Sequence, residues 1–146
     1  MLYVAEWSRV LKWPLAEAMA ALDGSGGKLT VNEPENVFVS DIPTADGGHH
    51  AWKFLAIGPD RALYVPVGSP CNICVVDSYG NPIDDKSVFG SILKVPPGGG
   101  VYSEAWKYAY GIRNTVGFDW HPVTQELFFT DNVSNTRHPG ETRHCL

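Results

Sequence analysis

The fold class of this chain is decided by Phe54-Leu55-Ala56-Ile57, the turn Gly58-Pro59-Asp60 and the run Ala62-Leu63-Tyr64-Val65-Pro66-Val67. Two short apolar runs flank a turn that contains glycine and proline, which is the pattern of two paired β-strands. The whole chain has a composition that suits many short strands and tight turns, with 15 glycines and 11 prolines in 146 residues. We therefore predict an all-β protein.

The same strand–turn–strand unit returns later in the chain. Val116-Gly117-Phe118-Asp119-Trp120 runs into His121-Pro122 and then into Glu126-Leu127-Phe128-Phe129-Thr130. The opening Leu2-Tyr3-Val4 matches the second half of the unit, so that leucines recur at positions 2, 63 and 127, which are 61 and 64 residues apart. This period exceeds the roughly 40–50 residues of common propeller repeats, but it suits four-stranded blades with long loops. Because a closed propeller needs about four blades or more, we predict a fragment of about two to three blades.

The rest of the chain supplies further elements. Residues 2–6 and 9–13 are expected to form a hairpin, and Pro14 with the alanine-rich segment after it predicts a helix over residues 15–22. A small sandwich of six to eight strands is the alternative architecture, although it explains the repeat less well. Further strands are predicted at residues 37–39, 90–95 and 108–110.

Charge and hydropathy exclude several classes of protein. Eleven basic against sixteen acidic residues give a net charge of −5, which argues against binding to nucleic acid. No apolar run is long enough to span a bilayer. The N-terminus lacks the basic region and apolar stretch of a secretory signal. Two interpretations follow: a cytosolic protein, or a chain that starts inside a longer one, and we prefer the second.

A series of motifs gives a more specific resemblance. Together they resemble the glucose/sorbosone dehydrogenase family, particularly its sorbosone-dehydrogenase-like branch, over residues 1–134. The resemblance implies a six-bladed β-propeller that carries pyrroloquinoline quinone (PQQ) and calcium and oxidises the C1 hydroxyl of aldoses or sorbosone-like sugars. Residues 135–146 lose the likeness and are expected to form a disordered tail. In chain order the motifs are His49-His50-Ala51-Trp52-Lys53, Ile57-Gly58-Pro59-Asp60, Leu63-Tyr64-Val65-Pro66-Val67-Gly68, Pro70-Cys71-Asn72-Ile73-Cys74, Gly90-Ser91-Ile92-Leu93, Gly111-Ile112-Arg113-Asn114-Thr115-Val116-Gly117-Phe118-Asp119-Trp120-His121-Pro122 and Phe129-Thr130-Asp131-Asn132.

His50 is the candidate catalytic base. The family places its base eight residues before the glycine of the Gly-Pro-Asp turn, and counting back from Gly58 leads to His50. An imidazole suits the removal of a hydroxyl proton near neutral pH. Glucose-oxidising members carry a supporting aspartate where this chain has Ser69, which weakens the case for glucose as substrate. Without the resemblance, a loop histidine that caps a strand is the simpler interpretation.

Arg113 and Asn114 are the candidate cofactor-binding residues. A planar guanidinium can hold the two oxygens of an ortho-quinone and stabilise the negative charge that grows there as hydride arrives. Asn114 offers further hydrogen-bond donors and matches a cofactor contact of the family. The alternative is that Arg113 forms a salt bridge between blades.

Val133 and Ser134 are the candidate calcium ligands, through their backbone carbonyls. The family supplies main-chain oxygens from the stretch that begins at Asp131 and Asn132, and calcium readily accepts such ligands. Here Val133 stands where the family has glycine, which puts the geometry of this loop in doubt, since valine rarely adopts a positive φ.

Cys71 and Cys74 form a Cys-x-x-Cys motif that follows a predicted strand. A thioredoxin-type motif needs a helix and a βαβ context, which this pattern lacks. A zinc site that also uses His49 and His50 has suitable ligand types but an unfamiliar spacing. We expect a local structural pair, bridged if the protein is exported and reduced otherwise.

Three functions therefore stand at this point. The first is the dehydrogenase, whose partners would be a small sugar and the missing blades or another chain that completes the propeller. Full-length family members are usually exported. The second is a non-catalytic propeller module that binds a protein or a glycan. The third is a calcium-dependent lactonase-like hydrolase, for which only Asp131 and Asn132 offer suitable side chains.

Overall fold

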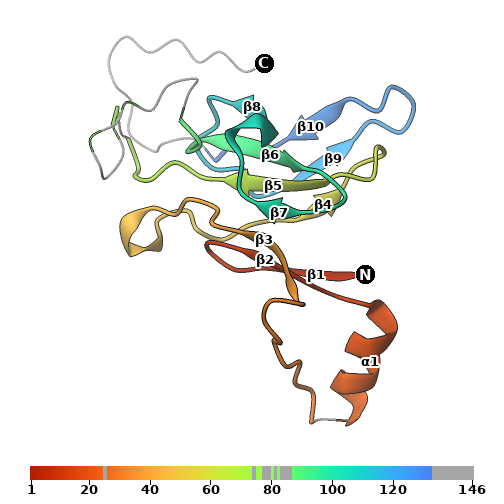
Figure 1. Ribbon diagram of the computed structural model, residues 1–146. Coiled ribbons are helices and arrows are strands. Elements are labelled where there is room, and N and C mark those ends of the chain that lie inside the picture. Colours follow the sequence, from red (N-terminus) through yellow and green to blue (C-terminus); the bar gives the residue numbers. More distant parts are fainter. Residues whose placement is uncertain (25, 74, 77–79, 81, 83–86, 133–146) are drawn as a thin grey trace.

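The fold consists of three β-sheets and little helix (Figure 1). The computed structural model describes residues 1–24, 26–73, 75–76, 80, 82 and 87–132. Within these residues, the sheets contain β1-β2-β3-β7, β4-β5-β6-β8 and β9-β10. The strands are β1 (Leu2–Ala5), β2 (Val10–Trp13), β3 (Val37–Ser40), β4 (Ala56–Ile57), β5 (Leu63–Val67), β6 (Ser91–Val95), β7 (Gly100–Val101), β8 (Lys107–Tyr110), β9 (Phe118–Trp120) and β10 (Leu127–Phe129). The all-β prediction is confirmed.

Strand pairing confirms the repeat that the leucines indicate. Each leucine is the first residue of a strand, β1, β5 or β10. Leu2 pairs with Trp13, the last residue of β2, just as Leu63 pairs with Val95, the last residue of β6. On its other side, Leu63 pairs with the last residue of β4, and Leu127 pairs likewise with the last residue of β9. The three segments are therefore equivalent strands of one repeating unit.

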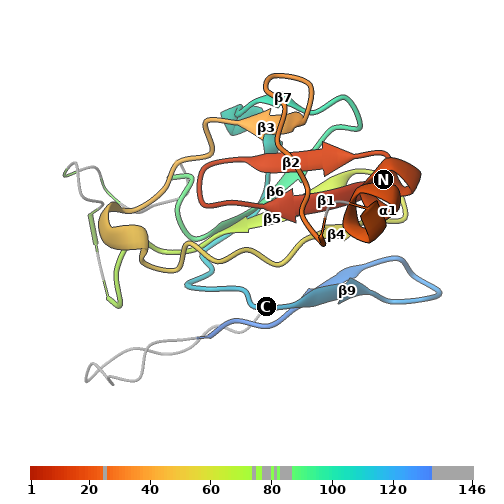
Figure 2. The same cartoon turned by 90° about the horizontal axis from the view of Figure 1, so that it is seen from below.

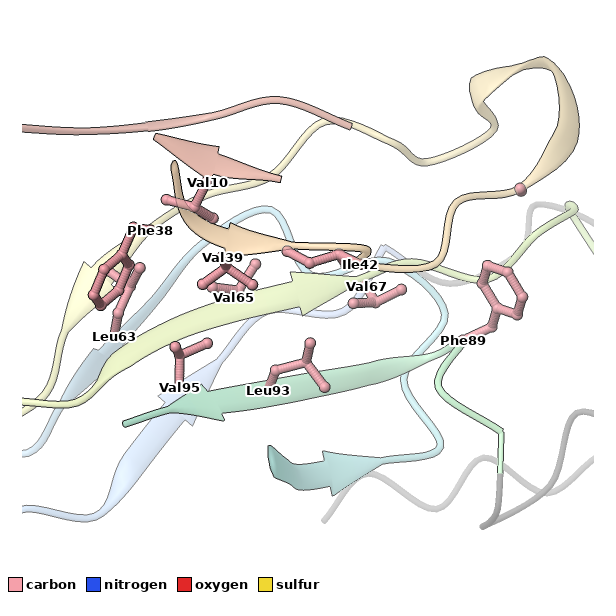
Figure 3. Close-up of a cluster of buried hydrophobic side chains, with 11 residues drawn as sticks. Val10, Phe38, Val39, Ile42, Leu63, Val65, Val67, Phe89, Leu93 and Val95 are labelled. Atoms are coloured by element: carbon pink, nitrogen blue, oxygen red, sulfur yellow. The ribbon is translucent and has the colours of Figure 1, made fainter. Parts of the chain in front are cut away.

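The main core lies between β1-β2-β3 and β4-β5-β6-β8 (Figure 3). Because side chains alternate along a strand, Leu63, Val65 and Val67 of β5 point to this core. From the facing sheet they meet Val10 and Val39, both without solvent exposure. This apolar layer fixes how the two sheets stack.

A second core covers the opposite face of β5. Tyr64 points there and packs with Ile92, Ile112 and Phe118. The ring centroids of Tyr64 and Trp120 lie 4.9 Å apart in an edge-to-face arrangement. Seen from below, β5 therefore lies between β2 on one side and β9 on the other (Figure 2). A strand that is buried on both faces reads as a continuous apolar run, which is the pattern of residues 63–67.

The helix α1 (Leu15–Gly24) packs against the outer face of the first sheet. Its one buried residue is Ala18, which contacts Leu11 and Trp13. The sequence predicts this helix to Leu22, and the structure extends it by two residues. Among the described residues, no helix is long and apolar enough to cross a membrane.

The short strand β7 is not predicted by the sequence. It pairs in parallel with β3, so that a loop between β6 and β8 reaches the edge of the first sheet. Gly99 makes this approach possible, since it adopts φ +66° and an added Cβ would lie 2.0 Å from the Phe38 carbonyl oxygen. Only glycine combines this conformation with so close a contact.

The described residues do not form the small sandwich that was the alternative architecture. They contain three packed sheets, and the middle sheet is covered on both faces. Within the same residues no sheet is closed on itself, since β1 and β10 each end a sheet.

Candidate functional site

Four loops meet at one end of the strands. They are residues 49–50, 68–72, 113–114 and 131–132, which follow the short helix η1 (Asp46–Gly48) and the strands β5, β8 and β10. The links between them are hydrogen bonds: Ser69 N–H donates to the Arg113 carbonyl at 2.7 Å, and Asn132 N–H donates to the Asn114 carbonyl at 2.9 Å. The sequence separates these loops by up to 83 positions, from residue 49 to residue 132, so that only the packing of the sheets brings them together.

His50 is held by the backbone that follows β5. Its Nδ1 lies 2.8 Å from the carbonyl oxygen of Ser69. A carbonyl can only accept, so Nδ1 carries the proton in the neutral ring and Nε2 keeps its lone pair. Where glucose-oxidising members carry a supporting aspartate side chain, this chain supports His50 with the main-chain carbonyl of Ser69. His50 itself adopts φ +49°, a left-handed conformation that is uncommon for histidine and frequent at functional sites.

Several groups act on the charge of His50. Partial burial is the main cause that lowers the pKa of its imidazole below the usual 6.5. The Ser69 carbonyl and the carboxylate of Asp131 act in the opposite direction, while His49 and Arg113 add to the lowering. The net result is an imidazole that is uncharged at neutral pH and able to accept a proton.

Gly68 allows His50 and Asn114 to approach each other. A Cβ at Gly68 would lie 2.5 Å from the Cβ of His50 and 2.9 Å from its carbonyl oxygen. The same atom would lie 3.3 Å from Asn114 Oδ1. Any side chain here would displace His50, so the missing Cβ lets the backbone that follows β5 pack directly against it.

Arg113 is fixed by three hydrogen bonds from its guanidinium. Nε donates to the Asn72 carbonyl at 2.8 Å, and one terminal nitrogen donates to the Asn72 side-chain oxygen at 2.5 Å. The other terminal nitrogen donates to the Asn132 carbonyl at 2.5 Å. None of the ion pairs within the described part of the chain involves Arg113, so the salt bridge between blades is not seen there.

Asp131 organises the loop that carries Arg113 and Asn114. Its carboxylate accepts the backbone N–H of Arg113 at 3.2 Å and that of Asn114 at 2.8 Å. An aspartate side chain that accepts two consecutive backbone N–H groups fixes the direction of the loop that carries them. The sequence placed Asp131 among carbonyl donors for calcium and missed this use of its side chain.

The structure thus brings together the predicted residues His50, Arg113 and Asn114. No role is predicted for Gly68 and Asn72 from the sequence, although both lie inside the motifs that carry the resemblance. Close approach and guanidinium binding depend on partners far along the chain, so no local pattern marks them. The predicted calcium ligands, Val133 and Ser134, lie outside the described residues, and so does the tail 135–146.

The cysteines and the side chains that could bind a metal form no second metal site among the described residues. Cys71 takes part in a disulfide bond. Cys74 and Cys145 lie outside the described residues. Among the described side chains, no three of the types His, Cys, Asp and Glu lie close enough to hold a metal ion.

The chain is thus a β-sheet protein. Its loops bring the imidazole of His50, whose pKa is lowered, close to the guanidinium of Arg113 and the amide of Asn114. The chain matches the family model described as Glucose / Sorbosone dehydrogenase over residues 7–135. It therefore belongs to the glucose/sorbosone dehydrogenase family.

Similarity to individual proteins covers less of the chain. An uncharacterized protein of Borreliella burgdorferi is 58% identical over 93 residues, which cover 62% of this chain and 21% of that protein. The chain thus spans about a fifth of the length of this curated relative. No solved structure matches the chain.

Proposed function

We propose that this chain is part of a PQQ- and calcium-dependent dehydrogenase that oxidises the C1 hydroxyl of aldoses or sorbosone-like sugars. Membership of the family supports a sugar dehydrogenase-like function. The single observation that carries the proposal further is His50, whose Nδ1 is bound to a carbonyl and whose Nε2 remains available as a base. The substrate is a small sugar, and neither nucleic acid nor a membrane is a partner in this proposal.

The proposed architecture is a fragment of a six-bladed propeller. Support comes from the sheet β4-β5-β6-β8, whose four strands are antiparallel in chain order, as in one blade. By their registers, β1-β2-β3 correspond to the last three strands of a preceding blade, and β9-β10 correspond to the first two of the next. In this proposal the remaining blades come from the rest of a longer protein or from another chain.

The residues of the site fit an ortho-quinone. A guanidinium has five N–H donors, and the three bonds of Arg113 leave two that can reach further acceptors. At Gly68 the backbone packs directly against His50, and Asn114 Oδ1 lies close to the same glycine, so that the imidazole and the amide belong to one small region. Bound there, PQQ would supply the acceptor for the hydride of the carbinol carbon.

The chain's own residues supply the proton transfer and the electrostatics. Nε2 of His50 takes the hydroxyl proton, which such a base accelerates by about 10²–10⁴-fold. The fixed charge of Arg113 stabilises the negative charge that develops during the reaction, at no cost of reorganisation, because Asn72 and Asn132 already hold it. Asn114 adds amide donors. The carbonyls of Val133 and Ser134 remain the predicted calcium ligands.

The test is reconstitution of the natural full-length protein that carries this sequence with PQQ and calcium. We expect aldose-dependent dye reduction, and we expect His50→Ala to lower it by about 10²–10⁴-fold without a change in Tm. His49→Ala is the matched control, since His49 is an exposed neighbouring imidazole, and it should retain activity within about twofold to threefold. Unchanged dye reduction in His50→Ala would contradict the assignment of the base.

The same experiment separates the other two functions. A non-catalytic binding module shows neither a spectral change with PQQ nor a rise in Tm with calcium. A lactonase-like hydrolase gains Tm with calcium and opens lactones without any dye reduction. The 146-residue chain alone is expected to bind PQQ weakly and to show no turnover, because the proposed propeller needs further blades to complete the cofactor and sugar pocket.

A further inference from the structure

A hollow of about 310 Å³ lies between the β1–β2 turn and the segment that follows His50. We call it the Lys53 hollow. Two indole rings, two alanine methyl groups, one carboxylate and one amine surround it. Its lining residues are Ala5, Glu6, Trp7, Ala51, Trp52 and Lys53. This volume is at the lower end of the range of small-molecule pockets.

The two tryptophans form an apolar rim that remains open to solvent. Trp7 is anchored on η1, since a Cβ at Gly48 would lie 2.5 Å from the indole ring. Its side chain is still 50% exposed, and that of Trp52 is 84% exposed. Exposed indoles around a hollow favour a ligand with its own C–H surface over a small ion.

The amine of Lys53 has no carboxylate partner in the described part of the chain. Its one hydrogen bond there is a long contact of 3.4 Å with the Ala51 carbonyl. Glu6 lines the same hollow, but its carboxylate is bound to Arg9. Burial without a counter-ion lowers the pKa of Lys53 to about 8. At pH 7.4 about a fifth of such an amine is uncharged, against about a thousandth of an ordinary lysine.

We propose that Lys53 is a carbonyl-reactive site that forms a reversible imine with small aldehydes admitted to the hollow, including open-chain sugars. The nitrogen lone pair attacks the carbonyl carbon, a C–N bond forms, and the carbonyl oxygen becomes a hydroxyl group. Loss of that hydroxyl as water leaves the C=N bond, so that nothing is oxidised or reduced. Desolvated lysines in apolar surroundings perform this chemistry in other proteins. The step needs neither PQQ nor His50, so it is independent of the proposed dehydrogenase.

The test traps the imine on the folded chain. Glycolaldehyde is added at pH 7.4 with cyanoborohydride, which reduces any imine to a stable secondary amine, and peptide mapping by mass spectrometry gives the rate at each lysine. We expect Lys53 to be modified at least about tenfold faster than Lys12, because the larger fraction of free amine outweighs its lower intrinsic nucleophilicity. Equal or slower modification of Lys53 would overturn the proposal.

Three further arms show that the hollow causes the reactivity. Lys53→Arg keeps the positive charge and should lose only the adduct at this position. Trp52→Ala should bring the rate at Lys53 toward that at Lys12, whereas Tyr110→Ala, which removes an aromatic side chain of 60% exposure from β8, should leave it unchanged. In urea sufficient to unfold the chain, Lys53 should be modified no faster than Lys12. A higher rate at Lys53 that persists in urea or in Trp52→Ala would also contradict the assignment.

Discussion

The two ends of β5 are built in opposite ways. Before the strand, Asp60 accepts a hydrogen bond from Lys94 at 2.6 Å and one from the hydroxyl of Tyr64 at 3.2 Å. After the strand, Ser69 and Gly68 meet an imidazole whose Nε2 remains available and a guanidinium that keeps two N–H donors. One end satisfies its charges within the fold, and the other leaves donors and acceptors for a ligand.

We infer from this difference that the end of β5 near Asp60 contributes to stability, whereas the end near Gly68 contributes to the proposed chemistry. At the first end, aromatic rings fill the space around Gly58, where an added Cβ would meet Tyr64, Asp60 and Trp120. At the second end, His50 lies beside Gly68. Left-handed residues occur at both ends, since Arg61 has φ +64° and His50 has φ +49°, so the two ends differ in their polar groups and not in backbone strain. The same substitution should therefore have different consequences at the two ends.

Among the substitutions that compare the two ends of β5, Gly68→Ala is expected to have the largest effect on activity. The new Cβ would lie 2.5 Å from His50 Cβ, so the imidazole must shift, and a displacement of about 1 Å can cost about 100-fold in rate. Dye reduction by the PQQ-reconstituted full-length protein measures this loss. Retention of full activity would show that His50 is not held by this contact.

Gly58→Ala is the matched variant at the opposite end of β5. Its Cβ would lie 2.6 Å from Tyr64 and 3.0 Å from Trp120, so that the aromatic packing must yield. We expect a loss of about 1–3 kcal/mol in unfolding free energy, as for overpacked cores, with kcat/KM unchanged below the Tm. Urea unfolding and dye reduction on the same sample measure both. A selective loss of activity here would remove the distinction between the two ends.

Arg113→Lys tests whether the fixed guanidinium matters beyond its charge. Lysine keeps the charge but cannot reproduce the contacts with both oxygens of Asn72 and with Asn132. Hydrogen bonds to a charged group are worth about 1.5–3 kcal/mol, so PQQ affinity should fall about tenfold to a hundredfold. Titration of tryptophan fluorescence with PQQ gives the Kd. An unchanged Kd would mean that charge alone suffices.

The pH profile tests the state of His50 directly. Since burial lowers its pKa below 6.5, the acid limb of kcat/KM should be centred below pH 6.5. The unfolded chain then binds more protons than the folded one just below pH 6.5, so this histidine also lowers stability as pH falls through that region. An acid limb centred above pH 7 would contradict the buried, neutral imidazole.

Asp60→Asn is expected to have the smallest effect of these substitutions. It should change stability and leave activity unchanged. The pair with Lys94 lowers the pKa of Asp60, so its contribution is present above about pH 4 and is lost as pH falls through the lowered value. The pair is also partly exposed, with side chains 35% and 43% accessible, and solvent screens it. The variant should therefore lose slightly in Tm at pH 7 and show a smaller drop between pH 7 and pH 3.

Asp119→Asn is the control for that experiment. Its carboxylate accepts only the neighbouring N–H of Trp120 among the described contacts, so the pH dependence of Tm should be that of the parent chain. An equal response of the Asp60 and Asp119 variants would assign the effect to net charge instead of to the pair with Lys94.

Much of the fold follows from local patterns. The continuous apolar run of residues 63–67 and the Gly-Pro turn before it predict β5 and its partner β4. Pro14 at the start and Gly24 at the end predict α1. The short strand β7 escapes prediction because its two residues pair only with the distant β3, a contact that no local period encodes.

Within the site, residue types were predictable and their interactions were not. The resemblance to the family, which places its base eight residues before the glycine of the Gly-Pro-Asp turn and a cofactor contact in the Arg-Asn loop, points to His50, Arg113 and Asn114 as candidates. That the Ser69 carbonyl, and not its hydroxyl, binds His50 depends on where β5 ends relative to η1. The carboxylate of Asp131 likewise acquires its partners from a loop 17 and 18 residues away.

The amino-acid sequence by itself determines the class of the protein: strands repeated at leucines 2, 63 and 127, and the residues that carry the family likeness. The tertiary structure alone decides how those residues act. Stacking of the sheets buries β5 on both faces, which places its two ends against different neighbours. Burial then sets the charge of His50 and Lys53, because desolvation depends on surroundings that come from distant parts of the chain.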